Sequence, residues 1–299
     1  MQAAPTSCAR VSSRRRDRKS PGANSRAFSL VELLVVVVII AIMASLLIPV
    51  LSKAKQQSAG AKCLDNQKQL AIALHMYAED NADRIVQTAD YLTGEEIYPA
   101  GGFWGGPRPS PHLWSNPETA LQAVQNGLIA SNAFYFYCGN LAIYHCPGDS
   151  RTTRSPFLDH PNGWAYDSYA RTQNLGGEPH HEFWGAGDTY RKLTAILRPA
   201  ATFSMMEGAD WRGYNVGTWS VFWSEGGFDW QNPPAVSHLR ASSVGFADGH
   251  AILHKWADPV VVAAGQGAAQ GRSEAEWAGP PSGADYNFIY NGYLFPGHP

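Results

Sequence analysis

The sequence lacks the patterns by which most enzymes and structural zinc sites are recognised. Four cysteines occur in 299 residues without a CxxC-type pair, which argues against zinc modules of the usual paired-cysteine kind. No HExxH sequence is present, and the glycine-rich stretch 260–271 has the wrong glycine spacing for a dinucleotide-binding loop. We therefore expect no enzymatic activity and interpret this stretch as a flexible loop.

Basic residues are scarce outside the N-terminus. Residues 1–27 carry seven basic side chains and one acidic side chain, a charge of +6 for this leader. Subtracting the leader from the net charge of −2 leaves −8 on the other 272 residues, which contain no basic patch. We therefore expect no nucleic acid partner.

A long apolar run follows the basic leader. Residues 33–51 contain no charged side chain, and a helix of this length, at about 1.5 Å per residue, approaches the thickness of a bilayer's hydrocarbon core, about 30 Å. No A-x-A-like cleavage site follows directly, so we expect the run to be retained as a membrane anchor. Because basic segments stay cytoplasmic, we expect a single-pass inner-membrane protein with a periplasmic or extracellular C-terminal domain.

The apolar run carries a carboxylate, Glu32, at its N-terminal edge. A charge at the edge of hydrocarbon normally needs a partner, and cleavage between Ala27 and Phe28 would create an amine four residues away. Residues 27–33, AFSLVEL, resemble the processing site of type IV prepilins and type II secretion pseudopilins. The resemblance implies that a prepilin peptidase cuts before Phe28 and methylates it, and that Glu32 then pairs with this amine on a neighbouring subunit.

One position departs from the family pattern. The family usually has glycine before the cut, whereas this chain has Ala27, so we expect cleavage at a slower rate. The resemblance further implies other pilin or pseudopilin subunits and an inner-membrane assembly platform as partners. The alternative interpretation is a plain single-pass anchor.

The sequence predicts that the helix continues beyond the membrane. Residues 28–51 form the membrane segment, with a bend expected at Pro49, and residues 52–82 form an amphipathic extension. Its apolar face is expected at Ala61, Leu64, Ala71, Leu74 and Ala78, which recur at helical spacing.

Residues 83–299 are long enough for one globular domain with its own core. Short β-prone runs such as Ala133–Tyr137 and Ala201–Met206 are separated by turn residues, and 93–117 and 207–234 read as long irregular loops. The predicted fold is α+β: a long N-terminal helix packed on an antiparallel sheet, as in pilins.

Residues 243–253 predict a hairpin with a two-residue Asp248-Gly249 turn. In this register Phe246 pairs with Ala251 and Val244 with Leu253, which places all four on one apolar face. His238, ten positions before Asp248, completes a His-x9-Asp-Gly pattern that resembles a C-terminal signature of a pseudopilin-like group, here ending in Phe246, Asp248, Gly249 and His250.

The signature allows two interpretations. His238 and Asp248 could bind a metal, or they could make structural hydrogen bonds, which we prefer. Calcium is known in the C-terminal domains of major pseudopilins, but no cluster of oxygen ligands here matches a calcium loop, so we assign no cofactor.

Three cysteines remain after the leader and its Cys8 are removed. An odd number in an oxidising compartment predicts one disulfide and one free thiol. Cys146, followed by proline, resembles the element that accompanies Cys63 in the pseudopilin-like group, and this resemblance favours a Cys63–Cys146 pair. The rival pair is Cys138–Cys146.

Two functions remain open. The first is a structural subunit that assembles into a type II secretion or type IV pilus-like filament. The second is a membrane-anchored module that binds a glycan through aromatic residues. These aromatic residues are Trp211, Tyr214, Trp219, Phe222, Trp223, Phe228 and Trp230.

Overall fold

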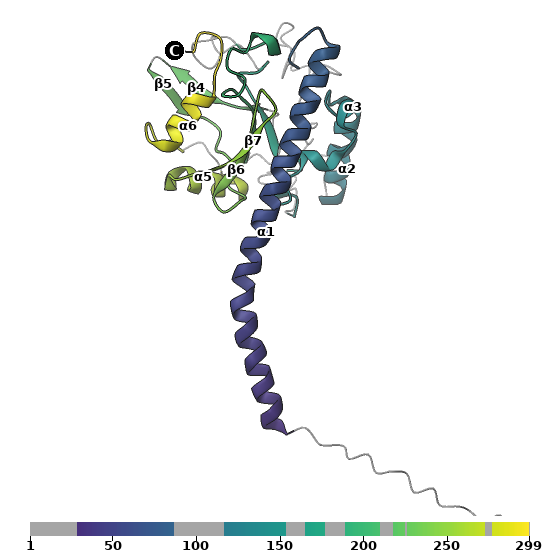
Figure 1. Cartoon of the computed structure of the whole chain (residues 1–299), viewed down its shortest axis with the longest axis vertical. Helices are drawn as coiled ribbons and strands as arrows, with labels where there is room; N and C mark the ends of the chain where they lie inside the picture. Colours follow the sequence, from purple (N-terminus) through teal and green to yellow (C-terminus); the bar gives the residue numbers. More distant parts are fainter. Residues whose placement is uncertain are drawn as a thin grey trace, which may run out of the picture. The chain divides into compact units, whose positions relative to one another are not determined.

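The computed structural model describes residues 29–86, 117–153, 165–176, 189–209, 218–224, 226–272 and 277–298. The chain (Figure 1) divides into two compact units, Met1–Pro49 and Val50–Pro299. The predicted leader, the predicted cleavage site at Ala27 and Phe28, and most of the predicted loop 93–117 lie outside the described residues.

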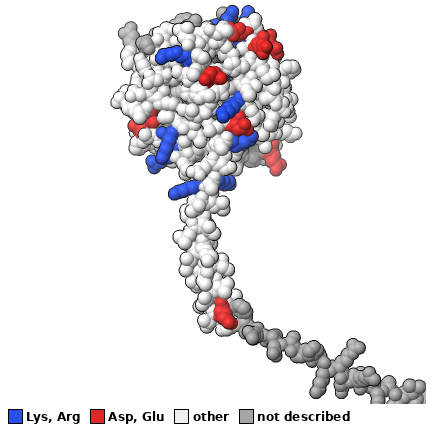
Figure 2. All heavy atoms as spheres, viewed as in Figure 1, with Lys and Arg blue, Asp and Glu red and all other residues white. Residues whose placement is uncertain are grey.

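A single helix, α1 (Leu30–Asp80), confirms the predicted N-terminal helix. Its 51 residues correspond to a contour length of about 76 Å, and neither Pro49 nor Gly60 interrupts it. In its first part the large apolar side chains from Leu30 to Leu51 are exposed. Figure 2 shows this part without charged side chains except for one acidic group near its N-terminal end. It is the one described segment long and apolar enough to cross a membrane.

The second part of α1 belongs to the globular unit and is amphipathic, as predicted. Its buried positions recur at helical spacing and include Cys63, Leu70 and Leu74. The buried face differs slightly from the prediction, because Ala61 is exposed and Leu64 is half-buried. The buried face also includes the amide side chains of Asn66 and Gln67 and the small residues Ala59, Gly60 and Ala73.

The main sheet has five strands in the order β3-β1-β2-β6-β7. All neighbouring pairs are antiparallel except β1 and β3. A separate antiparallel pair joins β4 to β5. The strands are β1 (Tyr169–Thr172), β2 (Phe203–Glu207), β3 (Thr218–Trp219), β4 (Val221–Ser224), β5 (Gly227–Trp230), β6 (Ala241–Phe246) and β7 (Ala251–Lys255). The predicted α+β class is therefore confirmed.

The two faces of the main sheet pack against different helices. One core joins Leu70 of α1, Val124 of α2 and Met205 of β2, and the other joins Val244 of β6 to Val261 of α5 and Ile289 of α6 (Figure 1). The remaining helices are α2 (Pro117–Ser131), α3 (Tyr135–Cys138), α5 (Pro259–Ala269), α6 (Ala284–Gly292) and the 3-10 turns η2 (Leu141–Tyr144), η3 (Arg151–Thr153) and η4 (Leu193–Ala195).

Three local predictions were wrong. The expected strand Ala133–Tyr137 is instead a turn leading into α3. Residues 207–234 contain β3, β4 and β5 rather than an irregular loop. The expected loop 260–271 is largely helix α5, which begins with Asp258 as N-cap and a proline in its first turn, both of which favour a helix start.

The β6–β7 hairpin exists, but its register differs by one residue from the prediction. Val244 pairs with Ile252 and Gly245 with Ala251, and the amide of Phe246 donates to the carbonyl of His250. The turn therefore contains three residues and ends at Gly249, whose φ of 95° suits a left-handed position. As a result, Leu253 and Ala251 lie on the face opposite Val244.

Candidate functional site

The start of α1 contains a reciprocal cap. The hydroxyl of Ser29 accepts a hydrogen bond from the amide of Val31 at 3.3 Å, and a carboxylate oxygen of Glu32 accepts one from the amide of Ser29 at 2.9 Å. This is a variant of the Ser-x-x-Glu capping box in which the hydroxyl accepts from the second helical residue rather than the third, and we did not predict it from the sequence. Glu32 therefore has a partner within its own chain, at the positive end of the helix dipole.

Residues 22–48 match the prokaryotic N-terminal methylation motif. The chain carries a prepilin-type N-terminus. The matched residues contain the predicted processing site and most of the exposed apolar part of α1, which is long and apolar enough to anchor the chain in a membrane. No curated protein and no solved structure matches the chain.

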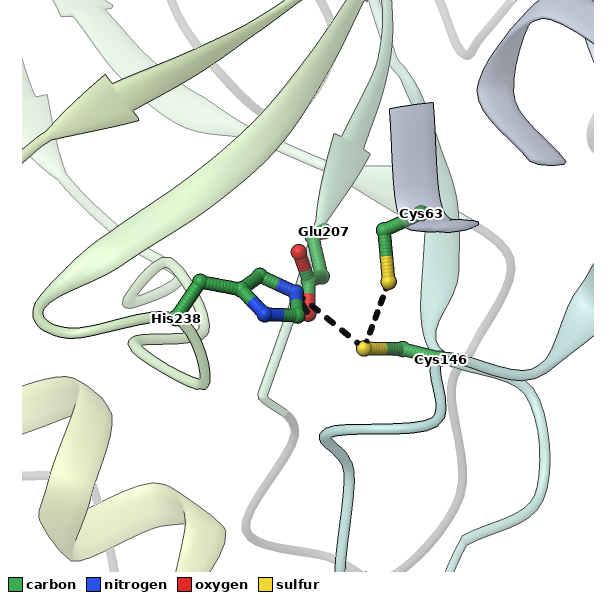
Figure 3. A group of neighbouring side chains, drawn as sticks. All are labelled: Cys63, Cys146, Glu207 and His238. Atoms are coloured by element: carbon green, nitrogen blue, oxygen red, sulfur yellow. Dashed lines mark hydrogen bonds and ion pairs between the residues drawn. The ribbon is translucent and has the colours of Figure 1, made fainter. Parts of the chain in front are cut away.

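The globular unit of this prepilin-type chain contains a buried cluster of four polar side chains from four separate segments (Figure 3). Cys63 lies on the buried face of α1, and Cys146 follows η2. Glu207 is the last residue of β2, and His238 lies in the turn before β6. All four are buried, and their ligand atoms lie within 4.8 Å of one another.

Short contacts join the four side chains. The Sγ atoms of Cys63 and Cys146 are 2.7 Å apart, longer than the about 2.05 Å of a disulfide bond, and both cysteines are free thiols in this structure. Nε2 of His238 lies 3.2 Å from Sγ of Cys146 and 3.2 Å from Oε1 of Glu207. The predicted pair Cys63–Cys146 is thus brought together, whereas Cys138 lies elsewhere, beside Tyr144.

Hydrogen bonds from neighbouring residues hold the cluster in place. Ser243 donates its amide and its hydroxyl to Oε2 of Glu207, at 2.9 and 3.0 Å. The amide of Gly148 donates to Sγ of Cys146 at 3.2 Å. His238 closes a tight turn with Ala241 through two backbone hydrogen bonds.

The central residues of that turn adopt an unusual conformation. Leu239 and Arg240 have φ angles of 54° and 69°, in the left-handed region that glycine or asparagine normally occupies. The pseudopilin-like group that the signature resembles tends to have glycines after the histidine, so the sequence Leu239-Arg240-Ala241 argued against a tight backbone approach here. The chain forms this turn although neither residue is glycine. The turn, closed by the hydrogen bonds between His238 and Ala241, positions His238.

The cluster strongly perturbs its ionisable groups. The hydrogen bond with Cys146 lowers the pKa of Cys63 to about 7, against the opposing effect of burial. Burial raises the pKa of Cys146 well above its usual range. Burial lowers the pKa of His238, but the neighbouring side chains of Cys63 and Glu207 outweigh it and raise that pKa to about 10. In the absence of a metal, the proton therefore stays on the imidazole.

The other residues of the C-terminal signature do not join the cluster. Asp248 accepts hydrogen bonds from the amide and the ring Nδ1 of His250, at 3.1 and 2.6 Å, and the ring of His250 stacks on Phe246. The structure therefore does not bring Asp248 to His238, which were our two candidate metal ligands. The carboxylate beside His238 is that of Glu207 rather than that of Asp248. We did not predict Glu207 as a site residue, although a carboxylate at the end of the apolar strand β2 was visible in the sequence.

The aromatic residues of the glycan hypothesis are mostly buried. Trp219, Trp223, Phe228 and Trp230 belong to the core between the sheet and α5 and α6, and Phe222 is partly exposed. Trp230 donates its ring N–H to the carbonyl of Pro280. Trp211 and Tyr214 lie outside the described residues.

Proposed function

We propose that the chain is a pilin-like or pseudopilin subunit that a prepilin peptidase cleaves between Ala27 and Phe28, and that assembles into a type II secretion or type IV pilus-like filament. The observation that carries the proposal is the N-terminal methylation motif at residues 22–48. In this proposal the chain has a structural rather than a catalytic role. Its partners are other pilin-like subunits and their inner-membrane assembly platform.

The exposed half of α1 supports assembly. Its apolar side chains have no partner among the described residues of their own unit. Lipid can cover them before assembly, and the same segments of neighbouring copies can cover them afterwards. In this arrangement the leader is cytoplasmic, and the globular unit is periplasmic or extracellular.

The capping box gives Glu32 a second role that must be separated from pairing between subunits. In a filament the carboxylate meets the methylated amine of Phe28 on a neighbouring copy. In the single chain it caps α1 through Ser29. Glutamine can still cap a helix at this position but carries no charge, so substitution by glutamine distinguishes the two roles.

We therefore expect Glu32→Gln and Glu32→Ala to reduce filament incorporation at least tenfold, while Ser29→Ala incorporates normally. Intact-mass analysis should show that all three variants begin at Phe28 with a methylated amine. Sedimentation of sheared filaments against the membrane fraction measures incorporation. Normal incorporation of Glu32→Gln would reject the pairing mechanism, and wild-type protein that begins at Met1 would reject the proposed function.

The glycan-binding alternative receives little support from the described rings. A platform for sugar stacking needs exposed aromatic faces, whereas four of the five described rings are buried. We therefore retain assembly as the proposed function.

A further inference from the structure

We propose that Cys63, Cys146, Glu207 and His238 together bind one Zn²⁺ ion inside the globular unit. Zinc in structural sites is four-coordinate and takes cysteine sulfur, histidine nitrogen and carboxylate oxygen as ligands. The cluster offers four such atoms, all buried and mutually within 4.8 Å. It is the one such group of four among the described residues.

Glu207 is the residue that most clearly calls for a cation. Its side chain is fully buried, and Oε1 has no hydrogen-bond partner among the described residues. Its basic neighbour is the imidazole of His238, but the same ring atom, Nε2, lies 3.2 Å from Oε1 and 3.2 Å from Sγ of Cys146. One ring nitrogen shared between two buried acceptors satisfies neither of them fully, whereas a cation among the four atoms would contact both.

The surroundings of the cluster suit a metal centre. Ser243 fixes Oε2 of Glu207, and the amide of Gly148 points at Sγ of Cys146. Such hydrogen bonds from outside the ligand set orient metal ligands. Two thiolates, one carboxylate and a neutral imidazole around Zn²⁺ leave a net charge of −1, which these donors partly offset.

A Cys63–Cys146 disulfide is the competing state. It would join the two sulfurs but would leave Oε1 of Glu207 dependent on the imidazole alone. Zinc requires a small rearrangement, because Zn–S bonds of about 2.3 Å in a tetrahedron place two sulfurs about 3.8 Å apart. The sulfurs, now 2.7 Å apart, would separate by about 1 Å. Binding releases the protons of both thiols and one proton of the imidazolium to solvent, and it involves no oxidation.

The two states can be distinguished in the full chain extracted from membranes in detergent without chelator or reductant. We expect one zinc per chain by elemental mass spectrometry. Cys63 and Cys146 should react with an alkylating reagent only after a chelator is added. A Cys63–Cys146 disulfide in this material, with no zinc, would overturn the proposal. Failure of the reduced chain to bind added zinc would also overturn it.

Cobalt substitution tests the ligands one by one. We expect wild-type protein and the control Cys138→Ser to give the thiolate-to-cobalt charge-transfer band and the visible bands of tetrahedral Co²⁺. The double variant Cys63→Ser/Cys146→Ser should lose the charge-transfer band. Ser243→Ala should weaken Co²⁺ binding by about tenfold through Glu207.

Glu207→Gln provides the decisive variant, because it keeps the size of the side chain. We expect Co²⁺ affinity to fall at least tenfold while the charge-transfer band persists at saturating metal. Circular dichroism checks that the variant is folded. Wild-type affinity in this variant would show that Glu207 is not a ligand and would reject the four-ligand site.

Discussion

The two halves of α1 place similar apolar side chains in different surroundings. Leu46 in the first half is 68% exposed, whereas Leu70 in the second half is fully buried against the globular unit. The first half of α1 and the globular unit also place carboxylates differently. The carboxylate of Glu32 is exposed and caps the helix, while the globular unit buries carboxylates beside basic or donor groups. Stability of the globular unit should therefore depend on the second half alone, and assembly on the first.

The largest expected effect concerns a buried ion pair in the globular unit. Arg151 donates from Nε and Nη2 to the carboxylate of Asp149, with a shortest distance of 2.7 Å. Burial raises the pKa of Asp149, but Arg151 outweighs burial and holds that pKa below its usual range. Arg151→Met should lower the free energy of unfolding by about 3–5 kcal/mol near neutral pH, measured by denaturant titration with tryptophan fluorescence.

The same pair predicts the acid response. Because the pKa of Asp149 is lowered by folding, its stabilisation is present above the unfolded value of about 3.9 and is lost as the pH falls through the folded pKa. The deficit of Arg151→Met should therefore shrink in acid. The control Lys62→Met removes an exposed pair with Asp65 and should change stability by less than about 1 kcal/mol. An equal loss in both variants would contradict the distinction between buried and exposed charge.

A matched pair of leucines tests the two halves of α1 directly. Leu70→Ala should destabilise the globular unit by about 2–5 kcal/mol, since it leaves a cavity in the core. Leu46→Ala should leave the unfolding midpoint of that unit unchanged. Thermal unfolding of the full chain in detergent measures both. A similar loss of stability from Leu46→Ala would show that the halves are not energetically independent.

The smallest expected effect is a gain in stability at the turn that positions His238. Arg240 has a φ of 69°, a conformation that costs a residue with a Cβ about 1–2 kcal/mol. Arg240→Gly should therefore stabilise the globular unit by up to about 1 kcal/mol, after the greater unfolded-state freedom of glycine is included. The control Lys255→Gly, in strand β7, should destabilise it. Chemical denaturation measures both changes.

The periodicity of the sequence predicted the long elements well. An uninterrupted apolar run and then a helical spacing of small and apolar residues predicted α1, and the β-prone run at 201–206 predicted β2. The short elements failed for local reasons. Asp248-Gly249 is compatible with two-residue and three-residue turns, and the choice between them depends on packing of the strands. The aromatic run at 133–137 became helical because tertiary packing overrides weak propensity.

The cluster was only partly predictable. The resemblance paired Cys63 with Cys146, and the signature drew attention to His238. Glu207 could not be connected to them, because no spacing in the sequence relates the end of β2 to a turn 31 residues later. Only the pairing of β2 with β6 brings the two side chains together. The helix cap at Ser29 and Glu32 was readable from four consecutive residues and was overlooked.

Gly60 has a mechanical consequence for the globular unit. A Cβ at this position would lie 2.9 Å from a methyl group of Leu253 and 3.5 Å from the ring of His238, so the helix backbone and the hairpin meet here without an intervening side chain. Shifting α1 by one residue, a rise of about 1.5 Å with a rotation of about 100°, would bring the side chain of Ala59 or Ala61 into this space. This clash opposes movement of α1 relative to the β6–β7 hairpin. A pulling force on this part of the helix is therefore transmitted to the sheet.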